Sequence, residues 1–318
     1  MGYLEVKQIK GKRHAYFVKK VSFMRKLLVI KKYIGLESPT INKEKYLIDN
    51  LNEISTNELE FRKGFLKLIK EDISHAENLP ERVEANAIKI NNLIEGKRFQ
   101  KILDTEFAKE FIFNSNNIEG SKIPPERVRE IIDSGDTKYF DRNEVKEVQN
   151  SVLAFNYIQK EFKFNLQSIK RLYNLLTKDL FREGNKPYPK GFKKEKNIVG
   201  NSETTAPENV AEELQNLINW YKRSKGYLHP LILAFEFHRR YEFIHPFLDG
   251  NGRTGRLIMN KILMSAGYPP IIIYKINKLS YFNAIEKSKE GKLKNYYNFM
   301  LEQTDKSYDY LLEVINRY

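Results

Sequence analysis

The feature of this sequence that most restricts its fold is a long series of segments with helical periodicity after residue 36. Apolar residues recur about every 3.6 positions in segments such as "STNELEFRKGFLKLIKEDI" and "LILAFEFHRRYEFI". The first of these opens with Ser55 and Glu58 at the spacing of a capping box. The same pattern predicts helices over 82–97, 105–119, 125–133, 142–162 and 166–181, and further helices between 207 and 318. We therefore expect a mainly α-helical bundle.

Two segments depart from the helical pattern. Residues 1–36 contain short apolar and β-branched runs bounded by turns with glycine, which predicts a small, basic β meander. Residues 182–207 are rich in Gly, Pro, Asn and Lys, which predicts a loop or a small β-hairpin inserted between helices.

Composition narrows the class of protein. The chain has no cysteine, which excludes disulfides, thiolate zinc sites and a cysteine nucleophile, and which fits a reducing cytoplasm. No apolar run approaches the roughly 20 residues that a membrane-spanning helix needs. The first residues, "MGYLEVKQIKGKRHAYF", contain no apolar signal core. We therefore expect a cytoplasmic protein with no membrane partner.

The positive charge is concentrated at the N-terminus. Of the net charge of +14, residues 1–35 contribute an excess of nine, because ten Lys and Arg face one acid, Glu5. A basic surface attracts nucleic acid, anionic lipid or an acidic protein, and charge alone does not choose among them. The simpler alternative is a solvated basic surface on a lysine-rich protein.

The stretch "HPFLDGNGRTGRL", which begins at His245, carries the strongest chemical signal. A helix is predicted to end near Ile244 and another to begin just after the glycines. The loop therefore leads into a helix N-terminus, where free N–H groups and the helix dipole favour an anion. Gly250 and Gly252 allow a positive φ and a close approach of the backbone to a polyanion. Asn251 adds a side-chain donor.

The charged residues of this stretch fit phosphate chemistry. Arg253 and Arg256 project on one side of the first helical turn, where both can bind phosphate oxygens. Asp249 would repel phosphate unless it held a metal, and Mg²⁺ bridging carboxylate and phosphate resolves the conflict. His245 can accept the proton of a hydroxyl nucleophile near neutral pH. A helix–loop–helix corner explains any one of these residues, whereas the set favours phosphoryl or nucleotidyl transfer.

"HPFLDGNGRTGR" is similar to the signature of the Fic family, His-Pro-Phe-x-Asp/Glu-Gly-Asn-Gly-Arg-x-x-Arg, at every fixed position. The resemblance includes the helices on both sides and covers about residues 105–302. It implies a Fic-type helical bundle with an inserted β-hairpin flap. The chain would then consist of a basic β-rich segment (1–36), a helical region (37–104), a Fic-like catalytic domain (105–302) and a C-terminal helix (303–318).

The resemblance implies transfer of AMP from ATP to a Ser, Thr or Tyr hydroxyl of a target protein or of the chain itself, with release of pyrophosphate. By family analogy His245 is the base and Asp249 the Mg²⁺ ligand. Asn251 and the loop amides would bind the α-phosphate, Arg253 the β-phosphate and Arg256 the γ-phosphate. The family resemblance also implies that the protein forms a homodimer.

Three further features follow the family pattern. Gly252 stands where the kinase-like Doc branch has lysine, which favours AMP transfer over phosphorylation. The segment "NIVGNSETTAPENV" resembles the flap that holds the target by strand-like pairing, with Asn197, Ile198, Val199 and Gly200 as its docking residues. Tyr281 matches a position that borders the adenine, and a core aromatic on a helix is the alternative.

"SNNIEG" indicates a built-in inhibitor. Ser115 and Glu119 lie four apart at a predicted helix end, and Gly120 suits the left-handed residue after it. A glutamate there is mildly unfavourable and favours a neighbouring cation, and solvent exposure is the simpler explanation. The segment resembles the Fic inhibitory motif, Ser/Thr-x-x-x-Glu-Gly/Asn, which implies that Glu119 pairs with Arg256 and hinders productive ATP binding. In some relatives this glutamate positions a water that removes AMP, so the reverse reaction stays open.

The competing hypothesis is a DNA-associated regulator that uses the basic N-terminus. Against it, the sequence contains no clear helix-turn-helix or stacking-aromatic module, and every chemical residue of the signature is present. His238, seven residues before His245, is interpreted as a core or capping histidine, because no third metal ligand accompanies the pair.

Overall fold

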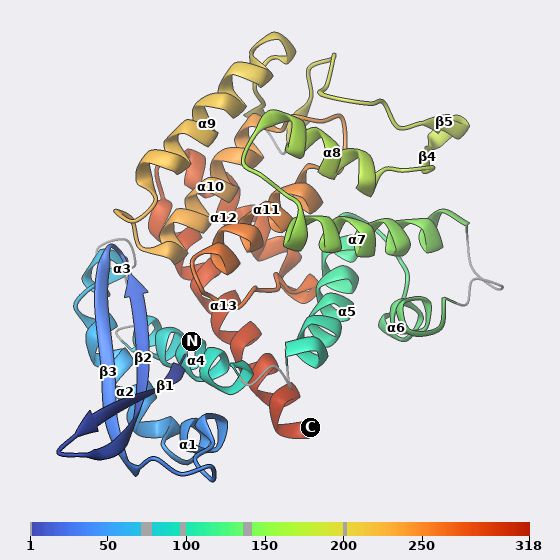
Figure 1. Cartoon of the computed structure of the whole chain (residues 1–318). Coiled ribbons are helices and arrows are strands. Elements are labelled where there is room, and N and C mark those ends of the chain that lie inside the picture. Colours follow the sequence, from blue (N-terminus) through green and yellow to red (C-terminus); the bar gives the residue numbers. More distant parts are fainter. Residues whose placement is uncertain (1, 71–77, 96–99, 136–141, 200–201) are drawn as a thin grey trace.

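The N-terminal residues form the expected antiparallel meander. In a computed structural model that describes residues 2–70, 78–95, 100–135, 142–199 and 202–318, the strands are β1 (Gly2–Ile9), β2 (Lys12–Phe23) and β3 (Lys26–Leu36), in the order β1-β2-β3. The sheet lies to one side of the helical body (Figure 1). Two-residue turns join its strands, with positive φ at Lys10, Gly11, Met24 and Arg25.

Four helices follow the sheet and cover one of its faces: α1 (Lys43–Asp49), α2 (Leu51–Lys63), α3 (Lys67–Lys70) and α4 (Leu79–Ile94). Alternate residues of β2 are buried, and Phe17 packs with Ile30, Leu47 and Ile54 in a small core between the sheet and α1 and α2. Phe23, at the end of β2, belongs to the main core of the protein. The sheet is therefore attached to the body by apolar packing.

The body is a helical bundle of α5 (Gln100–Ile118), α6 (Pro125–Ser134), α7 (Arg142–Lys160), α8 (Leu166–Leu176), α9 (Val210–Ser224), α10 (Pro230–Ile244), α11 (Asn251–Ser265), α12 (Lys278–Lys289) and α13 (Leu293–Arg317). Helices α10 and α11 lie at its centre and are buried on almost all sides (Figure 1). The expected mainly-α fold is confirmed. None of the described helices combines the length and apolar content that crossing a membrane requires.

The segment between α8 and α9 contains two short antiparallel pairs, β4 (Phe181–Arg182) with β5 (Lys186–Pro187), and β6 (Ile198–Val199) with β7 (Ser202–Glu203). The prediction that the helix beginning at residue 166 extends to residue 181 is therefore wrong. It stops at Leu176, because the Thr177 hydroxyl donates to the Tyr173 carbonyl and Asp179 takes a φ of 55°.

Two expected domain boundaries lie inside continuous helices. Helix α5 runs through the junction at 104/105, and α13 runs through the junction at 302/303. The reason is packing, since α13 contacts α12, α10, α5 and α4 along its length. The guanidinium of Arg82 on α4 also donates to Asp305 on α13, with 2.7 Å between Nε and Oδ1.

A buried polar network joins the N-terminal region to the bundle. The fully buried Glu84 carboxylate on α4 accepts from Arg62 of α2 at 3.2 Å and from the Tyr268 hydroxyl, and it lies 3.3 Å from His229 Nε2. Arg62 also donates to Glu58 at 2.6 Å. Since buried charges are stable only when paired, this network fixes α2 and α4 against the bundle.

Candidate active site

The predicted chemical loop connects the two central helices. His245 follows the last residue of α10 with a left-handed backbone (φ 50°), and its N–H donates to the Tyr241 carbonyl at 3.0 Å. Gly250, with φ 75°, precedes α11, which begins at Asn251. The sequence suggested that this helix begins just after the glycines, but it begins one residue before Gly252. The first amides of α11 have no acceptor within the helix, so they are available to an anion.

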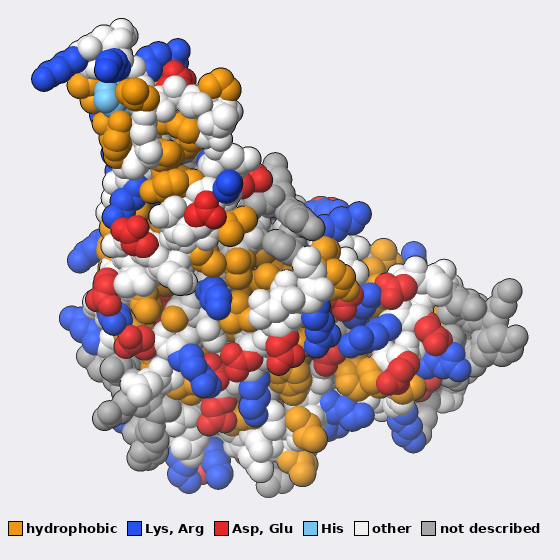
Figure 2. All heavy atoms as spheres, turned by 90° about the horizontal axis from the view of Figure 1, so that it is seen from below, with side chains coloured by type: hydrophobic (Ala, Val, Ile, Leu, Met, Phe, Trp, Pro, Cys, Tyr) orange, Lys and Arg blue, Asp and Glu red, His pale blue; other side chains and the backbone are white. Residues whose placement is uncertain are grey.

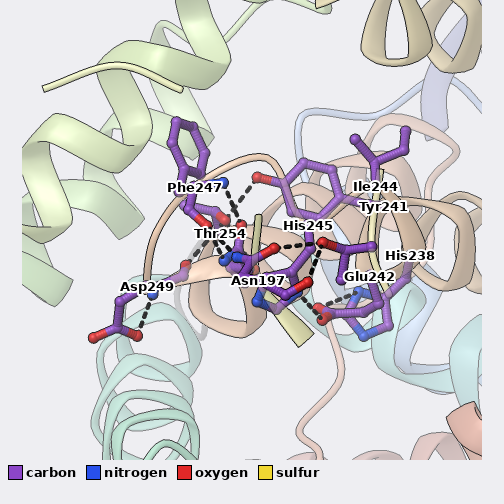
Figure 3. A network of polar contacts seen from close by, with 12 residues as sticks. Asn197, His238, Tyr241, Glu242, Ile244, His245, Phe247, Asp249 and Thr254 are labelled. Atoms are coloured by element: carbon purple, nitrogen blue, oxygen red, sulfur yellow. Dashed lines mark hydrogen bonds and ion pairs between the residues drawn. The ribbon is translucent and has the colours of Figure 1, made fainter. Parts of the chain in front are cut away.

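Asn251 holds the loop rather than projecting from it. Its side chain is 1% exposed, its Oδ1 accepts from the Phe247 N–H at 2.8 Å, and its Nδ2 donates to the Phe247 carbonyl at 2.9 Å. The Phe247 ring stacks on Tyr173 with centroids 4.0 Å apart. The side-chain donor that the sequence assigned to a phosphate is therefore bonded to the loop, and these contacts fix the path from His245 to α11 (Figure 3).

Both arginines of the signature are buried and paired with acids. Arg253 donates to Glu147 at 3.0 Å. Arg256 donates from Nε to the Ser115 hydroxyl at 3.0 Å, and from NH2 to the Ser115 carbonyl at 2.9 Å and to Glu119 at 2.7 Å. Its NH1 is buried and has no hydrogen-bond partner among the described residues. The predicted contact between the end of α5 and the second arginine is present.

The chain turns sharply behind Glu119. Gly120 has a φ of 111°, and the Ser121 N–H donates to the Asn116 carbonyl at 3.1 Å, which closes the end of α5 as expected. The turn places the Glu119 carboxylate against Gly252, where an added Cβ would lie 2.2 Å from Oε1. A side chain at position 252 would therefore displace the carboxylate. The predicted phosphate-binding space beside Gly252 is therefore next to the Glu119 carboxylate.

A cavity of about 490 Å³ opens beside these residues, a volume in the range of small-molecule sites. It is lined by Glu119, Glu242, His245, Gly252, Arg256, Tyr281, Phe282, Asn283, Ile285 and Glu286. Tyr281 is 1% exposed and shares a hydrogen bond of 2.7 Å with His238 Nε2. His238 is fully buried, as predicted for a core histidine, and burial lowers its pKa to about 3.

Asp249 lies apart from His245 on the outer side of the loop (Figure 3). Its Oδ2 accepts from the Tyr188 hydroxyl at 3.0 Å, and its Oδ1 accepts from the Gly250 N–H. The described residues contain no group of three or more potential protein ligands for a metal. A single carboxylate beside free helix amides suits an ion such as Mg²⁺, which takes its other ligands from phosphates and water.

Glu242 was missed by the sequence analysis, although it lies on α10 between His238 and His245. Its Oε1 is 3.9 Å from His238 Nδ1, and its Oε2 is 3.9 Å from His245 Nδ1. Burial, with a further contribution from Glu119, raises the pKa of Glu242 to about 8. Its spacing of three residues before His245 was the available signal. The carboxyl is next to the imidazole of the predicted base.

Lys193 was also missed, because a lysine in a Lys-rich loop gives no sign of burial. Its Nζ donates to Asn197 Oδ1 at 2.7 Å, to the Thr204 hydroxyl at 2.6 Å and to the Ile244 carbonyl at 3.3 Å. Burial lowers its pKa to about 8. Asn197 Nδ2 donates to the Phe247 carbonyl at 3.1 Å. The base of the predicted flap is thus fixed to the end of α10 and to the loop.

The predicted docking residues differ in their surroundings. Asn197 anchors the flap, Ile198 is 69% exposed, and Val199 completes β6. Gly200 lies outside the described residues. An exposed strand of this kind, fixed at its base, suits pairing with an extended segment.

Comparison with known proteins finds similarity to one family. Residues 139–263 match the Fic/DOC family. Curated relatives include the protein adenylyltransferase Fic of Drosophila willistoni, 32% identical over 207 residues, and that of Drosophila mojavensis, 31% identical over 212 residues. Each alignment covers 63% of this chain, but only 41% and 40% of the two relatives. The chain thus spans about two-fifths of the length of these relatives.

Solved structures share the fold. A Fic domain containing signaling protein from Bacteroides thetaiotaomicron has a TM-score of 0.66 at 21% identity, with 74% of this chain and 97% of that chain covered. Fic-1 from C. elegans has a TM-score of 0.56 at 16% identity, with 86% and 93% covered. The fold is therefore of the Fic type. The residues that match the Fic/DOC family, 139–263, contain the complete signature.

Proposed function

We propose that this protein is a Fic-type protein adenylyltransferase, which transfers AMP from ATP to a Ser, Thr or Tyr hydroxyl of a protein. The observation that carries the proposal is that His245, the start of α11 at Gly252, and Arg256 line one cavity of nucleotide size. The curated relatives are named as protein adenylyltransferases, which agrees with this chemistry.

In this reaction the imidazole of His245 takes the proton of the target hydroxyl. The oxygen attacks the α-phosphorus of ATP, the bond from that phosphorus to the bridging oxygen breaks, and pyrophosphate leaves. The free amides of α11 and the guanidinium groups of Arg253 and Arg256 bind the phosphates, where their charge stabilises the transition state. Asp249 would hold Mg²⁺, which supplies further positive charge to the phosphates when bound.

The target is expected to lie along the flap. Ile198 is exposed on β6 while Lys193 and Asn197 hold the base of the flap, so an extended target segment can add to the strand with its hydroxyl near His245. We also predict that the protein acts on a protein substrate, forms a homodimer and is located in the cytoplasm.

We further propose that Glu119 inhibits the enzyme. Its carboxylate occupies a donor of Arg256 and adds negative charge next to Gly252, where the phosphates would lie. If the same carboxylate oriented a water molecule, removal of AMP from a modified target would be the alternative activity of this site.

The transfer is tested with ATP labelled in two positions. The Glu119→Gly chain is incubated with Mg²⁺ and either α-labelled or γ-labelled ATP, and protein-bound label is counted. AMP transfer puts only the α-label on protein, whereas phosphorylation puts only the γ-label there. A γ-label result would overturn AMP transfer. If the Glu119→Gly chain bound ATP in a titration but kept neither label, even with added candidate targets, the reverse reaction would be favoured.

The pH dependence of this reaction is expected to be unusual. Burial, with a smaller contribution from Lys193, lowers the pKa of His245 to about 4, so the imidazole is neutral and able to accept a proton well below pH 7. Glu119 acts in the opposite direction, so its removal lowers this pKa further. Since the neutral form is active, kcat/KM of the Glu119→Gly chain should fall only as pH drops to about 4 or below. A midpoint near the ordinary histidine pKa of roughly 6.5 would contradict this assignment. The measurement is kcat/KM for AMP transfer across the acid range in which the protein stays folded.

A further inference from the structure

The N-terminal sheet has one face that no described helix covers. Strand residues alternate between faces, and in β2 the buried Phe17, Lys19 and Val21 face the helices. The register of the sheet places the alternate residues of all three strands on the opposite, outer face. The outer-face patch is formed by the aromatic and basic residues of this face, which it shares with Glu5, Ile9, Val18, Val29 and Leu36: Tyr3, Lys7, Lys12, His14, Tyr16, Lys20, Lys31 and Tyr33.

Aromatic rings form the middle of this patch. The rings of Tyr16 and Tyr33 lie 5.4 Å apart, and those of His14 and Tyr33 lie 5.6 Å apart. Tyr3 is 41% exposed and Tyr33 is 54% exposed. The rings come from adjacent strands, so they are spread over a flat surface that is about 10 Å wide at the usual strand spacing. Exposed rings on a sheet are the platform on which unpaired bases stack.

Lysines are interleaved with the rings. Lys20 Nζ lies 6.0 Å from the Tyr3 ring centroid, and Lys31 Nζ lies 4.7 Å from that of Tyr16. The one acid on this face, Glu5, is paired with Lys31 and lies 3.7 Å from Lys7, so the surface keeps an excess of positive charge. Orange and blue side chains, with few red ones, gather where the sheet projects from the body (Figure 2). Lysines at the spacing of the rings suit the phosphates of a strand whose bases stack.

We propose that the outer-face patch binds single-stranded nucleic acid. A membrane surface fits it less well, because the exposed rings at its centre carry hydroxyl or imidazole groups and alternate with lysines. The exposed aliphatic side chains on this face lie at its margins: Ile9 and Leu36 opposite Lys12 and His14, and Val29 and Leu27 toward the β2–β3 turn. The sequence analysis found no clear stacking-aromatic module, because this patch is not apparent in the linear sequence. Tyr3, Tyr16 and Tyr33 are far apart in sequence and meet only through the strand register.

The patch and the candidate active site belong to different parts of the fold. The patch lies on β1 to β3, whereas the cavity lies among α5, α10, α11 and α12. Nucleic-acid binding and AMP transfer can therefore be tested separately, and failure of one leaves the other unaffected.

The test is fluorescence anisotropy with the full chain and a labelled oligo-uridine or oligo-thymidine strand of about 12 nucleotides. Wild type should bind with a Kd that weakens as salt rises. Tyr16→Ala/Tyr33→Ala should weaken binding at least tenfold, and Tyr16→Phe/Tyr33→Phe should restore it, because stacking requires the ring and not the hydroxyl. An unchanged thermal unfolding midpoint of the Ala pair shows that weaker binding does not come from an unfolded sheet.

A second pair of variants tests the charge. Lys12→Gln/Lys20→Gln should reduce the slope of log Kd against log salt by about 1.4, or roughly 0.7 for each lysine. The matched control, Lys222→Gln/Lys306→Gln on exposed helical surfaces, should leave the slope unchanged. Equal binding by the Ala pair and wild type would overturn the proposal, as would equal slopes for the two lysine pairs. Binding to phosphatidylserine vesicles without binding to either strand would overturn it in favour of a membrane surface.

Discussion

Replacing His245 with alanine in the Glu119→Gly chain is expected to reduce the rate of AMP transfer by about 10²–10⁴-fold, the usual contribution of a positioned general base. The imidazole lines the cavity beside Gly252 and Arg256, and its lowered pKa keeps it neutral and ready to accept the proton. Incorporation of α-labelled AMP into protein over time measures the effect.

The backbone conformation of His245 determines which second substitution serves as the control. His245 has a φ of 50°, which strains alanine, whereas asparagine adopts a left-handed conformation readily and cannot act as the base. His245→Asn should therefore lose transfer to the same extent while keeping the thermal unfolding midpoint and the ATP affinity of its parent. Near-normal transfer by His245→Asn would remove His245 from the role of base.

Replacing Glu119 with glycine should raise AMP transfer about 10- to 100-fold over wild type. The carboxylate accepts a hydrogen bond from the buried Arg256 guanidinium and lies against Gly252. Hydrogen bonds to charged groups contribute about 1.5–3 kcal/mol to stability. In wild type the contact between Glu119 and Arg256 must break before ATP can bind Arg256, and breaking it costs that amount of free energy. The measurements are the initial rate of α-label incorporation and the affinity for ATP.

Two further variants distinguish loss of the contact between Glu119 and Arg256 from general effects of a substitution. Glu126 is an exposed glutamate on the neighbouring α6, so Glu126→Gly should leave transfer at the level of wild type. Glu119→Gln removes the charge but keeps the size of the side chain, and it should raise transfer less than Glu119→Gly does. If wild type and Glu119→Gly incorporated label at equal rates, the inhibitory role would be ruled out and the transferase activity would stand.

Local features of the sequence predicted most of the fold. The 3.6-residue periodicity predicted the main helices of the bundle, and alternating apolar runs predicted the meander, because both patterns depend on neighbours within a few residues. The chemical loop was also predictable, since its histidine, glycines and arginines lie within one short segment. The end of α8 was not, because the side chain of Thr177 and the backbone of Asp179 decided it.

The sequence by itself therefore determined the helical class, the β-rich N-terminus and the residue types of the candidate site. The pair of Glu119 and Arg256 was expected only through family resemblance, since 137 positions separate the two residues. Tertiary structure alone decided that Asn251 binds its own loop, that Lys193 is buried under the flap, and that tyrosines of three strands share one face. The physical reason is that a side chain's partner and burial depend on which distant elements pack beside it, and a linear pattern does not contain that information.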